Sequence, residues 1–128
     1  MKPLLIATSA IELGAGLALL CVPSSAALLL FGAPLDAPAA AFAARIGGLG
    51  LLTLGVACWL AHGDGDGDGT SPAARGLVKA MVIYNAGAAA VFAYAGGALG
   101  LHGILLWPAA LLHAAMTVWC LLRLAAPR

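Results

Sequence analysis

Four long apolar stretches alternate with shorter, more polar segments along the chain. Each stretch approaches or exceeds the roughly 20 apolar residues that a helix needs to cross the hydrocarbon core of a bilayer. Each also contains at most one charged residue. The stretches lack the strict alternation of apolar and polar positions that is typical of a membrane barrel strand. The pattern therefore predicts four transmembrane helices, at about residues 4–22, 39–60, 77–99 and 104–122.

The segments between these stretches complete the predicted architecture. Residues 26–31 are apolar but too short to cross, and Pro23 and the Gly32–Pro34 group bracket them, so we expect a short interfacial or re-entrant helical turn. Residues 63–72 predict a flexible polar loop, and residues 100–103 predict a tight turn. We expect one all-α domain over residues 1–128. It is an integral membrane up-down bundle of four transmembrane helices with a short interfacial segment after the first.

The composition identifies lipid as the solvent of this bundle. Of the 128 residues, 63% are hydrophobic and 9% are charged, whereas a soluble domain carries about 25% charged residues. The abundance of glycine and alanine is typical of helices that pack through small side chains. The net charge of +1 gives no reason to expect a nucleic-acid partner. The three cysteines form no Cys-x-x-Cys pair, so we expect small hydrophobes and no cofactor.

The distribution of basic residues predicts the orientation. In a bundle of four spans, the N-terminus, the loop at 63–72 and the C-terminus share one side of the membrane. Five of the six basic residues fall on that side, and Arg45 lies nearer the other face. The five are Lys2, Arg75, Lys79, Arg123 and Arg128. Because cytoplasmic segments are enriched in Lys and Arg, we expect a bacterial inner-membrane protein with both termini in the cytoplasm.

Four polar residues within the spans are the candidate functional residues. Glu12, Asn85 and His113 each lie roughly 12–14 Å from the nearest predicted boundary, close to the midplane, and Arg45 lies about 9 Å below the other surface. Each stands among small residues of its own helix. Ionisable groups at this depth are costly, so they usually face the bundle interior and find partners. We therefore expect Arg45 to reach either Glu12 or the headgroups.

Two interpretations of Glu12, Arg45, Asn85 and His113 remain open. They form either a network that fixes the register of the helices or a polar pocket that binds a small ligand or relays protons. One histidine and one carboxylate do not predict a metal site. In the loop, Asp64, Asp66 and Asp68 match the first half of a calcium loop, but Arg75 stands where its twelfth-position acid belongs. We interpret this segment as a solvated linker, with weak cation binding as the alternative.

The plan of the chain resembles that of small bacterial four-helix membrane proteins of the DoxX-like kind. The resemblance rests on Leu30-Phe31-Gly32 after the first helix, on Arg45-Ile46-Gly47-Gly48 in the second and on the short turn before the fourth. Some members of that group are subunits linked to quinone-dependent sulfur oxidation, but this chain has no redox motif. Glu12 is also similar to the proton-exchanging glutamate of small multidrug exporters, although Arg45 would repel a cationic substrate and the aromatic residues of such sites are missing.

Three classes of function follow from these features. Small-residue helix faces and the absence of an extramembrane domain favour a non-catalytic accessory or assembly subunit, which packs against a larger membrane-protein partner or forms a homo-oligomer within the bilayer. The second class is a binding protein for a lipophilic or small polar ligand that uses the four polar residues. The third is a proton-coupled exporter or a membrane enzyme. No catalytic residues are predicted.

Overall fold

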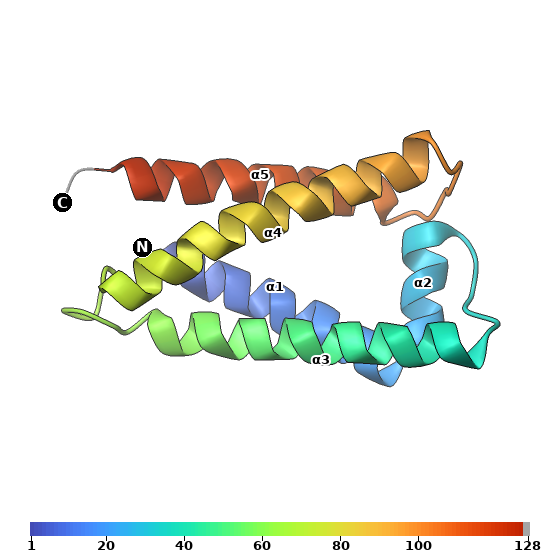
Figure 1. Cartoon of the computed structure of the whole chain (residues 1–128), viewed down its shortest axis with the longest axis horizontal. Helices are drawn as coiled ribbons and strands as arrows, with labels where there is room; N and C mark the ends of the chain where they lie inside the picture. Colours follow the sequence, from blue (N-terminus) through green and yellow to red (C-terminus); the bar gives the residue numbers. More distant parts are fainter. Residues whose placement is uncertain (127–128) are drawn as a thin grey trace.

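Five helices connected by short segments make up the protein. A computed structural model describes residues 1–126, and in this range every regular element is helical (Figure 1). The helices are α1 (Lys2–Cys21), α2 (Pro23–Phe31), α3 (Pro38–Ala61), α4 (Pro72–Gly97) and α5 (Leu106–Ala125). All except α2 are long and apolar enough to cross a membrane. The predicted fold class of a four-helix membrane bundle is therefore confirmed.

The largest differences from the predicted boundaries are at the start of α4 and at the end of α5, which is Ala125 rather than residue 122. Helix α4 begins at Pro72 rather than at residue 77 because the Ser71 side chain caps it, accepting a hydrogen bond from the Ala74 N–H at 3.0 Å. The proline then occupies the first helical position, where its missing N–H costs little. Helix α5 begins at Leu106 rather than at residue 104, and the N–H of the preceding Leu105 donates a hydrogen bond to the Leu29 carbonyl of α2.

Helices α1 and α3 pack side by side with their backbones in contact. A Cβ atom on Gly16 would lie 2.8 Å from the carbonyl oxygen of Gly48, and one on Gly48 would lie 2.7 Å from the carbonyl oxygen of Gly16. A third glycine of this interface, Gly55, is similarly close to Leu13. The predicted packing through small residues is therefore present between these two helices. Helices α4 and α5 form the second close pair.

The two pairs join in an apolar core at one end of the bundle. All four long helices contribute buried side chains to this core, which includes Leu4, Leu5, Cys58, Val78, Met81, Met116 and Cys120. The N-terminus, the α3–α4 loop and the end of α5 lie at this end, which we call the loop end (Figure 1). This placement agrees with the predicted up-down topology. Of the basic residues expected on this side, Arg128 lies outside the described residues.

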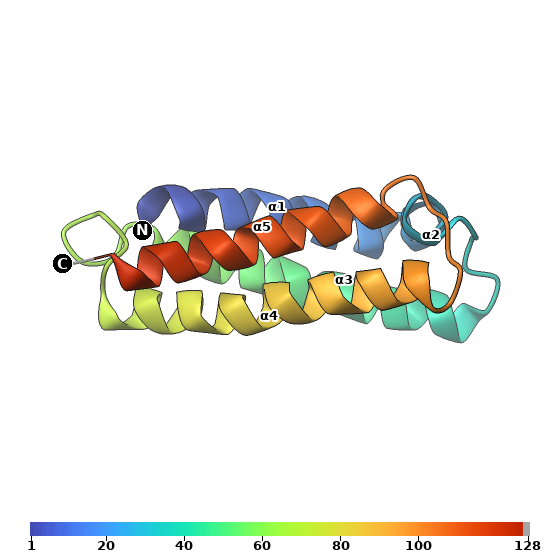
Figure 2. The ribbon, with the colours of Figure 1, turned by 90° about the horizontal axis from the view of Figure 1, so that it is seen from above.

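Helix α2 lies across the opposite end of the bundle, which we call the crossbar end. It runs roughly perpendicular to the long helices and is seen almost end-on in the second view (Figures 1 and 2). Its last carbonyl groups accept hydrogen bonds from the α4–α5 connection, from Leu105 N to Leu29 O at 2.9 Å and from His102 N to Phe31 O at 3.3 Å. Helix α2 therefore links the two helix pairs. It follows α1 directly in the chain, and its hydrogen bonds connect it to the segment between α4 and α5.

Glycine makes this junction possible. A Cβ atom on Gly103 would lie 2.1 Å from the carbonyl carbon of Leu30, so no other residue type fits without displacing α2. At the end of α2, Gly32 adopts φ +80°, a left-handed conformation that glycine reaches at little cost. The short predicted segment after the first helix is therefore a true helix with defined contacts at its C-terminus.

Candidate functional site

A buried carboxyl group faces the second helix pair near the middle of α1. Glu12 is 2% exposed, and the Tyr84 hydroxyl of α4 donates a hydrogen bond to its Oε2 at 3.2 Å. Within residues 1–126 this is the one hydrogen bond that the carboxyl accepts from a side chain. A carboxyl group at bilayer depth with a single neutral partner retains unused acceptor capacity.

Asn85 and His113 form a second polar pair beside the first. The Asn85 amide nitrogen donates to the Met81 carbonyl at 2.8 Å, so its Oδ1 faces His113 Nδ1, also at 2.8 Å. Since Oδ1 can only accept, the ring proton lies on Nδ1. In the neutral ring of this tautomer Nε2 is an acceptor, and no side chain or backbone group within residues 1–126 donates to it.

Aromatic rings pack against His113 and connect the two polar pairs. Phe92 stacks on the His113 ring with centroids 5.7 Å apart, and Tyr84 meets the same ring edge-on with centroids 5.6 Å apart. Tyr84 therefore contacts both Glu12 and His113. The two polar pairs form one cluster contributed by α1, α4 and α5, and its geometry is set by packing as well as by hydrogen bonds.

A cavity of about 410 Å³ extends from this cluster toward α2. Glu12, Tyr84 and His113 line its inner end, while Ala26, Leu29 and Leu30 of α2 lie at its other end. The remaining lining is apolar and comes from Ile11, Ala15, Ala18, Leu19, Leu51, Ala88, Val91, Phe92, Leu105, Ala109 and Leu112. From Glu12 to Leu19 the wall formed by α1 is about 10 Å long. The volume falls within the range of about 300–1,000 Å³ that is typical of small-molecule sites.

The structure brings together three of the four predicted site residues. Glu12, Asn85 and His113 are buried in one cluster, whereas Arg45 is exposed on α3. In the part of the chain that the structure describes, no ion pair joins Arg45 to Glu12. Helix α3 meets α1 through glycines, so the partner of Glu12 comes from α4 instead.

Tyr84 is the residue of this site that the sequence pattern did not indicate. Its position beside Asn85 in the sequence placed it at the same depth, and that depth was the available signal. A tyrosine in a membrane helix is usually a packing residue, and depth alone does not reveal the helix that it faces. Contact with Glu12, 72 residues away in the sequence, could be seen only in the fold.

The Asp-rich loop uses its carboxylates within its own turn. Asp68 Oδ1 accepts hydrogen bonds from the backbone N–H and the hydroxyl of Thr70, at 3.0 and 2.6 Å. Asp64 Oδ2 accepts one from the Ser71 hydroxyl at 3.2 Å. Hydrogen bonding from Thr70 lowers the pKa of the exposed Asp68 carboxyl below its ordinary value. Among residues 1–126, no three His, Cys, Asp or Glu side chains are grouped so that they could hold a metal ion.

Comparison with known proteins adds no assignment to this geometry, since no family model, curated protein or solved structure matches the chain.

Proposed function

We propose that this protein binds a small amphipathic molecule within the membrane. The single observation that carries this proposal is the cavity of about 410 Å³, which joins a buried carboxyl, a tyrosine and a histidine to an apolar space between the helix pairs. A purely structural network would need no such space. Apolar pockets with a few convergent polar groups are the usual form of a ligand site.

The polar groups define the kind of head that the ligand carries. The Glu12 carboxyl has unused acceptor capacity, and His113 Nε2 is a free acceptor on the same cavity wall. A molecule that donates hydrogen bonds, through a hydroxyl or an ammonium group, complements both. The remaining lining is apolar and suits a short hydrocarbon or ring portion that extends toward α2.

The proposal also includes a location. We place the protein in a bacterial inner membrane with the loop end in the cytoplasm, because Lys2, Arg75, Lys79 and Arg123 all belong to that end. Ligand would then enter from the bilayer. Several cavity-lining side chains are partly open to the surroundings, among them Val91 (66% exposed) and Leu29 (46%). The resemblance to DoxX-like proteins remains a prediction, and an inner-membrane location is consistent with it.

Filling the cavity tests the proposal directly. Ala109→Leu enlarges a side chain that lines the cavity, whereas Ala114→Leu makes the same change at an exposed position of α5 outside the lining. The protein and both variants are extracted gently from their own membrane, and the molecules that they release are quantified by mass spectrometry. We expect wild type and Ala114→Leu to carry the same compound in near-stoichiometric amount and Ala109→Leu to carry little.

Other outcomes would contradict ligand binding. Equal retention in both variants would show that the bound compound does not occupy the cavity. Recovery of the wild type only within a larger assembly, without a bound small molecule, would favour the accessory-subunit role instead.

Glu12→Gln then separates the two kinds of head group. It removes the negative charge that an ammonium requires, but it keeps an acceptor for a hydroxyl.

A further inference from the structure

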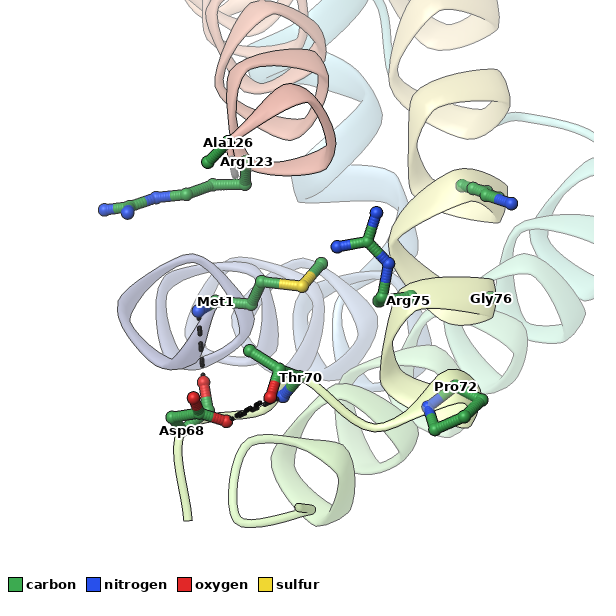
Figure 3. A pocket seen from close by; sticks show the side chains of 9 residues that line it. Met1, Asp68, Thr70, Pro72, Arg75, Gly76, Arg123 and Ala126 are labelled. Carbon is green, nitrogen blue, oxygen red and sulfur yellow. Dashed lines mark hydrogen bonds between the residues drawn. The ribbon is translucent and has the colours of Figure 1, made fainter. Parts of the chain in front are cut away.

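A second hollow, of about 690 Å³, lies at the loop end of the bundle. It is separate from the cavity that Glu12, Tyr84 and His113 line. The start of α4, the end of α5 and the loop before α4 enclose it (Figure 3). We call it the basic cleft because three cationic side chains line it, Arg75, Lys79 and Arg123. Of the described residues that line it, Asp68 is the one with an acidic side chain.

Asp68 offsets only part of this charge, since one acidic side chain stands against three basic ones. One oxygen accepts both hydrogen bonds from Thr70, so the carboxylate is directed at its own turn and not at the arginines (Figure 3). The backbone carbonyl of the same residue accepts a hydrogen bond from the Met1 nitrogen at 3.0 Å. The lining therefore has an excess of positive charge.

Arg75 is held in position to meet an anion. It is partly buried, and its Nη2 donates a hydrogen bond to the Leu124 carbonyl near the end of α5, at 3.2 Å. Its guanidinium projects into the space between α4 and α5, while Arg123 extends outward at the rim (Figure 3). A guanidinium has five N–H donors, so several remain for a ligand. Fixing the side chain in advance reduces the entropy lost when an anion binds.

The length of α4 places the cleft at the depth of lipid headgroups. Its 26 residues span about 39 Å, whereas the hydrocarbon core of a bilayer is about 30 Å thick. If its more apolar part crosses the core, roughly the first six residues, from Pro72 onward, project beyond it. Arg75 belongs to this part, and Lys79 lies within reach of the same surface. Basic pockets between transmembrane helices are known binding places for phosphate-bearing headgroups.

We propose that the basic cleft binds a phosphate-bearing anion, which is either the headgroup of an anionic lipid or a free phosphate compound. Planar guanidinium groups match the oxygens of a phosphate, and the neighbouring ammonium adds charge without demanding a particular geometry. This site is independent of the amphipathic ligand proposed above, since the two hollows share no lining residue.

Native mass spectrometry with two lipids tests the inference. The purified protein is titrated in a zwitterionic detergent with dioleoyl phosphatidylglycerol or dioleoyl phosphatidylcholine, with and without inorganic phosphate as competitor. Lys79→Gln removes one charge from the cleft and leaves the Arg75–Leu124 hydrogen bond intact. Arg45→Gln removes one charge from an exposed position outside the lining. We expect Lys79→Gln to weaken phosphatidylglycerol binding about fivefold and Arg45→Gln to leave it unchanged.

Each outcome decides the question. Selective binding of phosphatidylglycerol that inorganic phosphate does not displace identifies a lipid headgroup as the ligand. Displacement by phosphate supports a free phosphate compound. Equal binding of phosphatidylcholine would overturn the proposal, and so would an equal loss in Arg45→Gln, because general attraction to charge would then explain the result. Circular dichroism of both variants establishes that each is folded.

Discussion

The contact between α1 and α3 leads to a sharp prediction about two neighbouring glycines. Gly47 has open space where a Cβ atom would go, whereas a Cβ on Gly48 would lie 2.7 Å from the Gly16 carbonyl oxygen and 2.8 Å from the Leu20 nitrogen. Ordinary contacts of a Cβ atom begin at 3.4 Å. Both of these neighbours belong to the backbone, which cannot rotate away. Gly48→Ala therefore has to push the helices apart, and Gly47→Ala does not.

The two substitutions should change stability in opposite directions. Replacing glycine by alanine at an open helical position stabilises by about 0.5–1 kcal/mol. Overpacking a close interface costs about 1–3 kcal/mol, because a gap of even 0.5–1 Å removes a quarter to a half of each dispersion contact. We therefore expect Gly47→Ala to be roughly 1.5–4 kcal/mol more stable than Gly48→Ala, which is a factor of more than ten in the unfolding equilibrium.

Unfolding in mixed micelles measures this difference. The wild type and both variants are titrated with sodium dodecyl sulfate in a mild detergent, and helix content and tryptophan fluorescence report the folded fraction. Gly16→Ala serves as a second probe of the same contact, and the double variant with Gly48→Ala should cost less than the sum of the two, since one separation of the helices relieves both clashes. Equal stability of Gly47→Ala and Gly48→Ala would refute close backbone packing between α1 and α3.

Three further predictions concern other parts of the structure. Tyr84→Phe removes the hydrogen-bond donor to Glu12 and should cost about 0.5–1.5 kcal/mol in the same unfolding titration. It should also weaken retention of any ligand bound in the cavity. Gly103→Ala places a Cβ against the Leu30 carbonyl and should speed hydrogen exchange of the α2 amides, while those of α3 stay unchanged. Asp68→Asn should abolish the pH dependence of loop order. In the wild type the lowered pKa of Asp68 stabilises the loop above the ordinary aspartate pKa of about 3.9, and this contribution is lost as the pH falls through the lower folded value. Amide exchange in residues 63–71 checks this.

The hydropathy of the sequence predicts the helices well because each long helix is a continuous apolar run. Predicted and observed boundaries agree to within two residues for α1 and α3, and Glu12 and His113 are buried as expected. Hydropathy and depth do not report the direction in which a side chain points around its helix. Depth alone therefore left open whether Arg45 reaches Glu12 or the headgroups, and it did not indicate that Tyr84 is the partner of Glu12.

The cavity could not be predicted because it depends on the separation of the two helix pairs, and the basic cleft could not because it lies between the start of α4 and the end of α5. Their walls combine residues that are distant in the sequence, and no single helix carries a pattern that indicates an empty space. The later start of α5, at Leu106, also involves a contact between residues that are distant in the sequence. Residues 104 and 105 are apolar enough to begin a helix, but the Leu105 N–H donates a hydrogen bond to the Leu29 carbonyl of α2. Tertiary contacts of this kind override local preference.

Helix α2 acts as a spacer of fixed length. Its nine residues measure about 13 Å, and they separate the helix pairs at the crossbar end by a backbone distance rather than by side-chain packing. Hydrogen bonds at the C-terminus of α2 and the glycine junction at Gly103 keep that distance constant. The pocket beneath it is therefore preorganised. Because the backbone of α2 sets the spacing, the ligand proposed above would bind without first having to separate the helices.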